Sequence, residues 1–452
     1  MYKRQEDDGA PNAFLEAATA AAAELHLDVA LTLAQKGAKL ARTGGVGYAL
    51  EVLAGEVARD VGDAGASAAA FARAVELATT DSERSLAHIG VASAHRLTSS
   101  VEPGFAALDA AQPIAERLGL TRELARIAYL RGSLHFARGE LGTCAAEHER
   151  ALTHAREAGD EACEAQALSG LADVLYANGR MSSAHGAFSR CVALADRRGD
   201  VRFTLMNRNL MGLVDLYLGE VARGLATIER SRLAAREIGH RVAEVMADEC
   251  AGLVLVGAGR DQEAVAPVER SLALAREISS RRFAAIDLAL LGIIAHRAGD
   301  LESARARFDE SWALLTEIGP RFAGPLMLAS RSRIAGSDQE RRDWLAQGEN
   351  LLRAGSISHN HFWFREAAID GSLDAGDPDE AERHADELER YASVEPSPWS
   401  QFVVARGRAL AAARRDRADE QALRLLRDRA LQLDLRAALP GLERALASVS
   451  DR

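Results

Sequence analysis

The stretch GSLHFARGELGTCAAEHERA at residues 132–151 decides the fold, because its spacing of small residues returns every 40 residues. Its central Gly139 recurs at that interval as Gly179, Gly219, Gly259 and Gly299, and we call these five the turn glycines. A small residue stands seven positions before each of them: Gly132, Ala172, Gly212, Gly252 and Gly292. Small residues also follow after five and twelve positions, and a larger one after nine: His148, Phe188, Ile228, Val268 and Phe308.

These offsets predict pairs of antiparallel helices. A glycine can adopt the left-handed conformation that ends a helix, so each turn glycine marks the end of a first helix. The small residues let two helices approach closely, and the larger residue fills the space between them. A second stop follows about 20 residues later, where Asp160 and Asp200 can cap the next helix. Each 40-residue unit is therefore predicted to hold two helices of roughly 16 residues, which gain most of their stability from packing.

The composition agrees with an all-α fold. The chain has 452 residues, too many for one compact core, whereas a repeat array grows along one axis. Strong helix formers dominate, aromatic residues make up 5%, and no stretch alternates as a strand would. We therefore predict an all-α fold of tandem antiparallel helix hairpins.

The repeat resembles the tetratricopeptide (TPR) pattern, although its 40 residues exceed the usual length of about 34. The resemblance implies hairpins stacked into a right-handed superhelical solenoid. It also implies a concave, partner-binding face lined by the first helix of each pair. Carrying the offsets over to that face names nine candidate residues: Arg126, Tyr129, Ser133, Gln166, Asp173, Tyr176, Asn207, Asn209 and Glu249. Asn207 and Asn209 stand mid-helix, where asparagine is mildly unfavourable, so either groove contacts or ordinary solvation explains them.

The regularity of the repeat divides the chain into five segments with about eleven hairpins. We expect a disordered or artefactual N-terminus at 1–12, less regular hairpins at 13–118, and regular repeats at 119–320. Divergent hairpins are expected at 321–435, where Gly336 and Gly376 continue the 40-residue step, and a capping helix with a tail at 436–452. The opening MYKRQ is interpreted as an artefactual leader, which makes the chain the tail of a longer protein.

Four stretches resemble the C-terminal TPR region of large bacterial signalling proteins. They are LTRELARIAYLR (120–131), AEHERALTHAR (146–156), ISHNHFWFREAA (357–368) and EPSPWSQFVVARGRAL (395–410). In that family a class III adenylate or guanylate cyclase domain and a P-loop ATPase module precede the repeats. The resemblance implies a regulatory tail whose enzymatic domains lie outside this chain.

No sequence motif for catalysis, metal binding or a cofactor is found, so we expect no enzymatic activity, no metal and no cofactor. The chain has no Gly-Lys dipeptide, as a P-loop needs, and no Gly-x-Ser-x-Gly. Its four cysteines form no CxxC pair and are interpreted as packing residues in a reducing cytoplasm. A net charge of −11 argues against direct nucleic-acid binding, and the lack of a long apolar run argues against a membrane span.

The densest unusual cluster is His359, His361, Trp363 and Phe364. Two histidines at i and i+2 would point to different faces of a helix, which disfavours a metal site. We interpret the cluster as an aromatic N-terminal helix turn that packs into a neighbouring hairpin, together with Trp399.

The sequence therefore predicts a cytoplasmic, non-catalytic scaffold whose partner is a protein, a peptide or an attached domain of a longer chain. An alternative is the sensor arm of a LuxR-type or related transcriptional activator, since such arrays occur there as well. A free-standing enzyme is the third reading and has no motif to support it. The sequence names neither the partner nor the oligomeric state.

Overall fold

The computed structural model describes residues 9–24, 26–41, 44–98 and 100–450. Within these ranges the chain forms 23 α-helices and one short 3-10 helix, η1, and no strand. None of the helices described is both long and apolar enough to cross a membrane. The prediction of an all-α fold is confirmed.

The chain divides into two compact units, Met1–Leu171 and Ala172–Arg452. The boundary falls inside α9 (Glu161–Ala177). The first unit holds α1 (Gly9–Ala23), α2 (Leu27–Leu40), α3 (Gly45–Asp60), α4 (Ala64–Leu77), α5 (Asp81–Leu97), α6 (Val101–Leu118), α7 (Thr121–Arg138) and α8 (Leu141–Glu157).

The second unit continues with the end of α9 and the remaining helices. These are α10 (Met181–Arg197), α11 (Val201–Tyr217), α12 (Val221–Glu237), α13 (Arg241–Ala258), α14 (Asp261–Glu277), α15 (Arg281–Arg297), α16 (Leu301–Ile318), α17 (Gly324–Ser332), α18 (Asp338–Arg353), α19 (Ser358–Asp374), α20 (Pro378–Ala392), α21 (Pro398–Arg414), α22 (Glu420–Gln432), η1 (Arg436–Ala438) and α23 (Leu439–Ser450).

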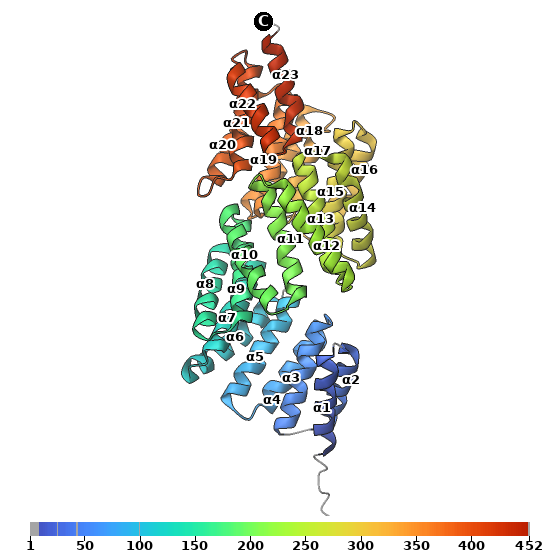
Figure 1. The fold of residues 1–452 in the computed structure, drawn as a ribbon, viewed down its shortest axis with the longest axis vertical. Helices are drawn as coiled ribbons and strands as arrows, with labels where there is room; N and C mark the ends of the chain where they lie inside the picture. The colour runs from blue at the N-terminus through green and yellow to red at the C-terminus, as the bar shows by residue number, and fades with distance from the viewer. Residues whose placement is uncertain (1–8, 25, 42–43, 99, 451–452) are drawn as a thin grey trace, which may run out of the picture. The chain divides into compact units, whose positions relative to one another are not determined.

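Consecutive helices pair into hairpins within each unit, from α1–α2 to α7–α8 in the first and from α11–α12 to α21–α22 in the second, and α23 packs on α22 (Figure 1). These are ten hairpins in the described ranges, close to the number that the repeat spacing predicts. The first helix begins at Gly9, four residues before the expected start at residue 13, and residues 1–8 of the expected N-terminal segment lie outside the described residues. The last helix includes Pro440 in its first turn, where proline is tolerated.

The turn glycines all adopt the left-handed conformation, with φ between 74° and 84°. Their amides and those of the next residue bond back to the helix, as when Gly259 N donates to Val256 O and Arg260 N to Leu255 O. The predicted caps also form, because the Asp200 carboxylate accepts from Phe203 N and that of Asp160 from Cys163 N. The first helix of each repeat therefore ends where the sequence predicts.

Close helix packing explains the small residues that precede the turn glycines. A Cβ placed on Gly132, Gly212, Gly252 or Gly292 would lie 2.5–2.7 Å from the side chain at the larger repeat position. Those side chains are His148, Ile228, Val268 and Phe308, all buried. Ala172, the fifth small residue, is buried as well. The predicted fit of a large residue against a small one is confirmed. The four cysteines are likewise buried and free, so they pack as expected.

The second unit also closes on itself, which the repeat pattern does not predict. Helix α21 packs on α11, and η1 packs on α13. Three successive turn glycines meet the C-terminal half of the unit: Gly179 faces Tyr391, Gly219 faces Leu433 and Gly259 faces Ala437. At Gly259 the approach is backbone to backbone, because a Cβ there would lie 2.2 Å from Ala437 N. We call this set of contacts the closure.

The closure makes two equivalent glycines unequal. Gly259 and Gly299 share the left-handed conformation, yet a Cβ on Gly299 would meet nothing within 4 Å. Gly299→Ala should therefore cost only the left-handed strain, about 1–2 kcal/mol. Gly259→Ala should add roughly 1–3 kcal/mol of overpacking against Ala437. Urea unfolding followed by far-UV circular dichroism measures both, and equal losses would show that the closure contributes nothing to stability.

Candidate functional site

Helix α19 lies at the centre of the candidate site, and its sequence explains why. Twelve of its residues are buried, including polar Asn360 and Arg365, so it has no continuous solvent face. Its N-terminal turn is held by Asn360, whose side-chain amide donates to Phe322 O over 2.6 Å. The Asn360 carbonyl oxygen accepts from Leu326 N of α17. The aromatic half of α19 is thereby fixed in place and packs against other helices.

The aromatic residues of α19 reach helices far back in the chain. Trp363 Nε1 donates to the hydroxyl of Tyr217 on α11 over 3.2 Å. The rings of Phe362 and Tyr217 lie 5.1 Å apart, and Trp399 of α21 lies 5.4 Å from Phe362. The expectation that this turn packs with Trp399 is confirmed. Its contact with Tyr217, 146 residues earlier, is a part of the closure that the sequence did not reveal.

His359 of α19 connects α9 and the turn before α17 as a neutral ring. Its Nε2 lies 2.9 Å from Phe322 O, so that nitrogen carries the proton and donates. Its Nδ1 lies 3.0 Å from the hydroxyl of Tyr176 on α9 and therefore accepts. Burial lowers the pKa of His359 to about 4, in agreement with a neutral ring at physiological pH. His361 instead stacks on Tyr391 at 4.0 Å, so the two histidines diverge. The structure around them gives each a packing role.

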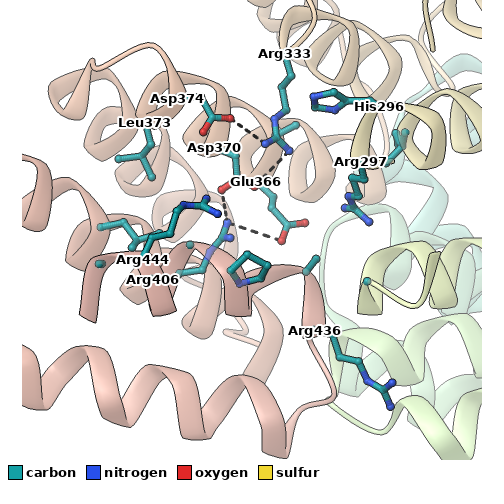
Figure 2. A pocket seen from close by; sticks show the side chains of 18 of the residues that line it. His296, Arg297, Arg333, Glu366, Asp370, Leu373, Asp374, Arg406, Arg436 and Arg444 are labelled. Atoms are coloured by element: carbon teal, nitrogen blue, oxygen red, sulfur yellow. Dashed lines mark hydrogen bonds and ion pairs between the residues drawn. The ribbon is translucent and has the colours of Figure 1, made fainter. Parts of the chain in front are cut away.

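Beside the C-terminal half of α19 lies a cavity of about 810 Å³, which we call the α19 pocket (Figure 2). Residues of α15, α17, α19 and α21 form its inner walls, and η1 and α23 form another wall. Its size falls in the range typical of ligand-binding cavities. Six arginines and five carboxylates line it: Arg297, Arg333, Arg406, Arg414, Arg436, Arg444, Asp261, Glu366, Asp370, Asp374 and Asp416.

An ion-pair network joins the acidic face of α19 to two arginines. Arg333 Nη2 lies 3.0 Å from Asp374, and Arg406 Nη2 lies 2.7 Å from Asp370. A longer contact of 3.9 Å connects Arg406 to Glu366. Figure 2 shows the three carboxylates directed toward these arginines from one side of the pocket. The network holds α17, α19 and α21 together around the cavity.

Burial and neighbouring charges set the protonation states in the pocket. Burial raises the pKa of Glu366, and the Arg406 charge opposes that rise. Burial alone would lower the pKa of Arg333, but Asp370 and Asp374 outweigh it and raise that pKa. Burial and two arginines lower the pKa of His296 to about 4, so this ring adds no charge at neutral pH. Ion pairs and hydrogen bonds are therefore the polar interactions that the pocket lining makes at neutral pH.

The structure separates the nine predicted concave-face residues. Arg126, Tyr129, Ser133 and Gln166 lie in the first unit, on α7 and α9, and are partly exposed. The other five, Asp173, Tyr176, Asn207, Asn209 and Glu249, lie in the second unit, and all except Asp173 are buried in it.

The two asparagines among these residues hold backbone rather than a partner. Asn209 Nδ2 donates to Ala243 O of the next hairpin, and Asn207 Nδ2 donates to Phe203 O within its own helix. Tyr176 is likewise occupied by His359. Their role in binding a partner stays a prediction, and for Tyr176 it requires α19 to move away.

The pocket uses the predicted offsets in other repeats. Glu366, Asp370 and Leu373 stand ten, six and three positions before Gly376, the same offsets that Tyr129, Ser133 and Tyr176 have from their turn glycines. Ser330 and Arg333 stand six and three positions before Gly336. The same offsets thus recur in the lining of the pocket, while their assignment to a partner-binding face stays a prediction. The sequence interpretation missed these positions because it applied the offsets only to the regular repeats.

A second polar cluster lies on the inner helices of the same unit. Burial raises the pKa values of Asp173 and Glu249 to about 7, and the Arg282 charge opposes both shifts. Burial and the Glu249 charge raise the pKa of Asp287 well above its usual value. No group of three or more histidine, cysteine or acidic residues in the described chain has a geometry that could hold a metal ion. Burial therefore favours the protonated form of these three acids.

Comparisons with known proteins support the fold. No protein-family model and no curated protein sequence matches the chain. Among solved structures, it is similar to the apo form of RapI, with a TM-score of 0.56 and 12% identity over 76% of this chain and 97% of that chain. It is also similar to a Rap protein complexed with Competence and Sporulation Factor, with a TM-score of 0.53 and 13% identity over 89% and 98%.

A weaker similarity relates the chain to a signal transduction ATPase with a tetratricopeptide repeat sensor from Pyrococcus horikoshii. The TM-score is 0.47 and the identity 14%, over 82% of this chain and 54% of that chain. At their low identities, the two Rap structures show a shared helical-repeat fold.

The buried acids predict an unusual pH dependence. Because the folded-state pKa of Glu249 lies near 7 and the unfolded value near 4.5, stability should fall as pH rises from about 4.5 through 7. The glutamine of Glu249→Gln cannot ionise. At pH 8 this variant should therefore exceed the native chain in free energy of unfolding by roughly 1–3 kcal/mol and should melt at a higher temperature. At about pH 4, below both pKa values, Glu249 is protonated in the folded and unfolded states, so the two proteins should melt together.

Thermal unfolding at both pH values measures the effect. The exposed Glu237→Gln, at the end of α12, controls for loss of a charge. Histidines with lowered pKa values, such as His359, destabilise below about pH 6.5 and so overlap this window, but they act equally on both proteins and cancel in the comparison. A melting difference between Glu249→Gln and the native chain that does not change with pH would contradict the assignment.

Proposed function

We propose that this chain is a non-catalytic interaction scaffold that binds a peptide segment in the α19 pocket. The observation that carries the proposal is the pocket itself, an 810 Å³ cavity on inner-helix positions with a charged lining. Inner-helix positions are where stacked-repeat proteins present their binding surfaces. The Rap structure solved with Competence and Sporulation Factor shares this fold, which supports a bound factor as the kind of partner.

We further propose that binding acts on attached domains of a longer signalling protein, as its regulatory tail. Two of the four family-like stretches bear on the site. Residues 357–368 form most of the N-terminal part of α19, and 395–410 include Arg406 and Leu410 of the pocket. A ligand that contacts α19 and α23 together would change the free energy of the closure. Such a coupling is what a regulatory scaffold requires.

Filling the pocket tests the proposal. Ala367 lies in the lining, so Ala367→Trp should occupy the space and abolish peptide binding. Gln347→Trp places the same ring on the exposed side of α18 and should leave binding intact. A library of labelled random hexapeptides, screened by fluorescence anisotropy on the full chain, supplies the ligands. If the peptides that bind do so equally to Ala367→Trp, the site lies elsewhere, and if none binds the proposal fails.

A further inference from the structure

The hydrogen-bonding capacity of the α19 pocket is unbalanced. Its carboxylates on α19 each contact an arginine of the wall, and Asp261 contacts Arg297 over 2.9 Å. In contrast, the Nε atoms of Arg333 and Arg406 are buried with no hydrogen-bond partner in the described chain. No lining carboxylate oxygen is in that state among the residues described. The buried groups of the pocket lining that lack a hydrogen-bond partner are therefore hydrogen-bond donors.

Two further arginines add free positive charge. Arg414 at the end of α21 and Arg444 on α23 are exposed, and within the described residues neither has a hydrogen bond or ion pair. Figure 2 shows Arg444 and Arg406 reaching toward the same region beside α19. Since His296 is neutral, the lining carries six positive charges against five negative ones. The chain as a whole is acidic, with a net charge of −11, so a local excess of positive charge distinguishes this pocket from the rest of the protein.

Arg406 is the residue that distinguishes a built site from a solvated surface. The residue is only 3% exposed, yet it lines the pocket and keeps one N–H unused. A buried donor without a partner destabilises the protein, unless a ligand or a water molecule accepts its hydrogen bond. Guanidinium groups pair with carboxylate and phosphate through two parallel hydrogen bonds, which suits an oxyanion placed between Arg406 and Arg444.

We infer that the α19 pocket takes an oxyanion: the ligand of the proposed function presents a carboxylate or phosphate group to Arg406, Arg414 and Arg444. The inference rests on that function, because it identifies the chemistry of the segment bound in the same pocket. A cationic segment would find the α19 carboxylates already paired and would meet unpaired arginines at the wall. An acidic segment instead supplies the acceptors that the pocket lacks.

The test uses four probes on the full chain, measured by isothermal titration calorimetry. They are an amidated hexapeptide of alternating glutamate and alanine, its glutamine counterpart, its lysine counterpart, and inorganic phosphate. The glutamate peptide should bind, and the glutamine and lysine peptides should not. Binding should weaken as salt is raised, because the charges lie at a partly open surface.

The double variant Arg414→Gln, Arg444→Gln tests the site with little risk to folding, since both side chains are exposed. It should weaken the glutamate peptide at least about tenfold, given the strength of charge-assisted hydrogen bonds. Arg230→Gln, exposed on α12 and away from the pocket, is the matched control and should bind as the native chain does. Unchanged melting temperatures would confirm that folding is intact.

The outcomes separate this inference from the proposed function. Phosphate bound with the same dependence on Arg414 and Arg444 supports the oxyanion site and identifies phosphate as a sufficient source. If the glutamate peptide binds and phosphate does not, the oxyanion that the pocket takes is a carboxylate. Preferred binding of the lysine or glutamine peptide, blocked by Ala367→Trp, overturns the inference and leaves the pocket as a peptide site. Equal binding by the double variant and the native chain also overturns it.

Discussion

In a stacked-repeat protein each hairpin needs to touch only its neighbours, so nothing in nearest-neighbour packing requires one turn of the array to meet another. The second unit adds such a contact. The N-terminal turn of α19 hydrogen-bonds to Tyr176 and Tyr217, on helices more than 140 residues earlier. Because α19 is fixed there by its aromatic half, its acidic half is held against α17 and α21. The α19 pocket lies beside this acidic half, between the helices that are held together in this way.

The closure also explains why polar groups that look suited to a surface are found inside. Asn209 donates to the backbone of the next hairpin, and His359 is held neutral between a tyrosine hydroxyl and a carbonyl oxygen. Buried polar groups of this kind specify one arrangement, because any other would leave them without partners. Glu249 is different, because one of its carboxyl oxygens is buried without a hydrogen-bond partner. Burial raises its pKa to about 7, so the carboxyl group keeps its proton up to near-neutral pH. Stability of the unit is thereby linked to pH as well as to packing.

The α19 pocket and the closure share structural elements. One wall of the pocket belongs to η1 and α23, and η1 is also the element that rests on Gly259. A segment that bridges α19 and α23 would strengthen the closure, and one that displaces η1 would weaken it. In either case the effect at the pocket reaches α13 through the Gly259 contact. This shared use of one short segment provides a physical route from binding to a change in the array.

The sequence by itself determined the hairpin. The turn glycines, the small residues seven positions earlier and the larger residues nine positions later are local requirements of helix ends and helix contacts, so a 40-residue period reveals them. Glu366 and Asp370 of the pocket stand at the same offsets from a glycine as two of the residues that the repeat pattern named. Only the tertiary structure decided which inner faces stay accessible. Tyr176 and Glu366 occupy comparable inner positions, yet the first is buried by α19 and the second lines a cavity. The contacts that decide between them span nearly 200 residues, and no periodicity encodes a contact that occurs once.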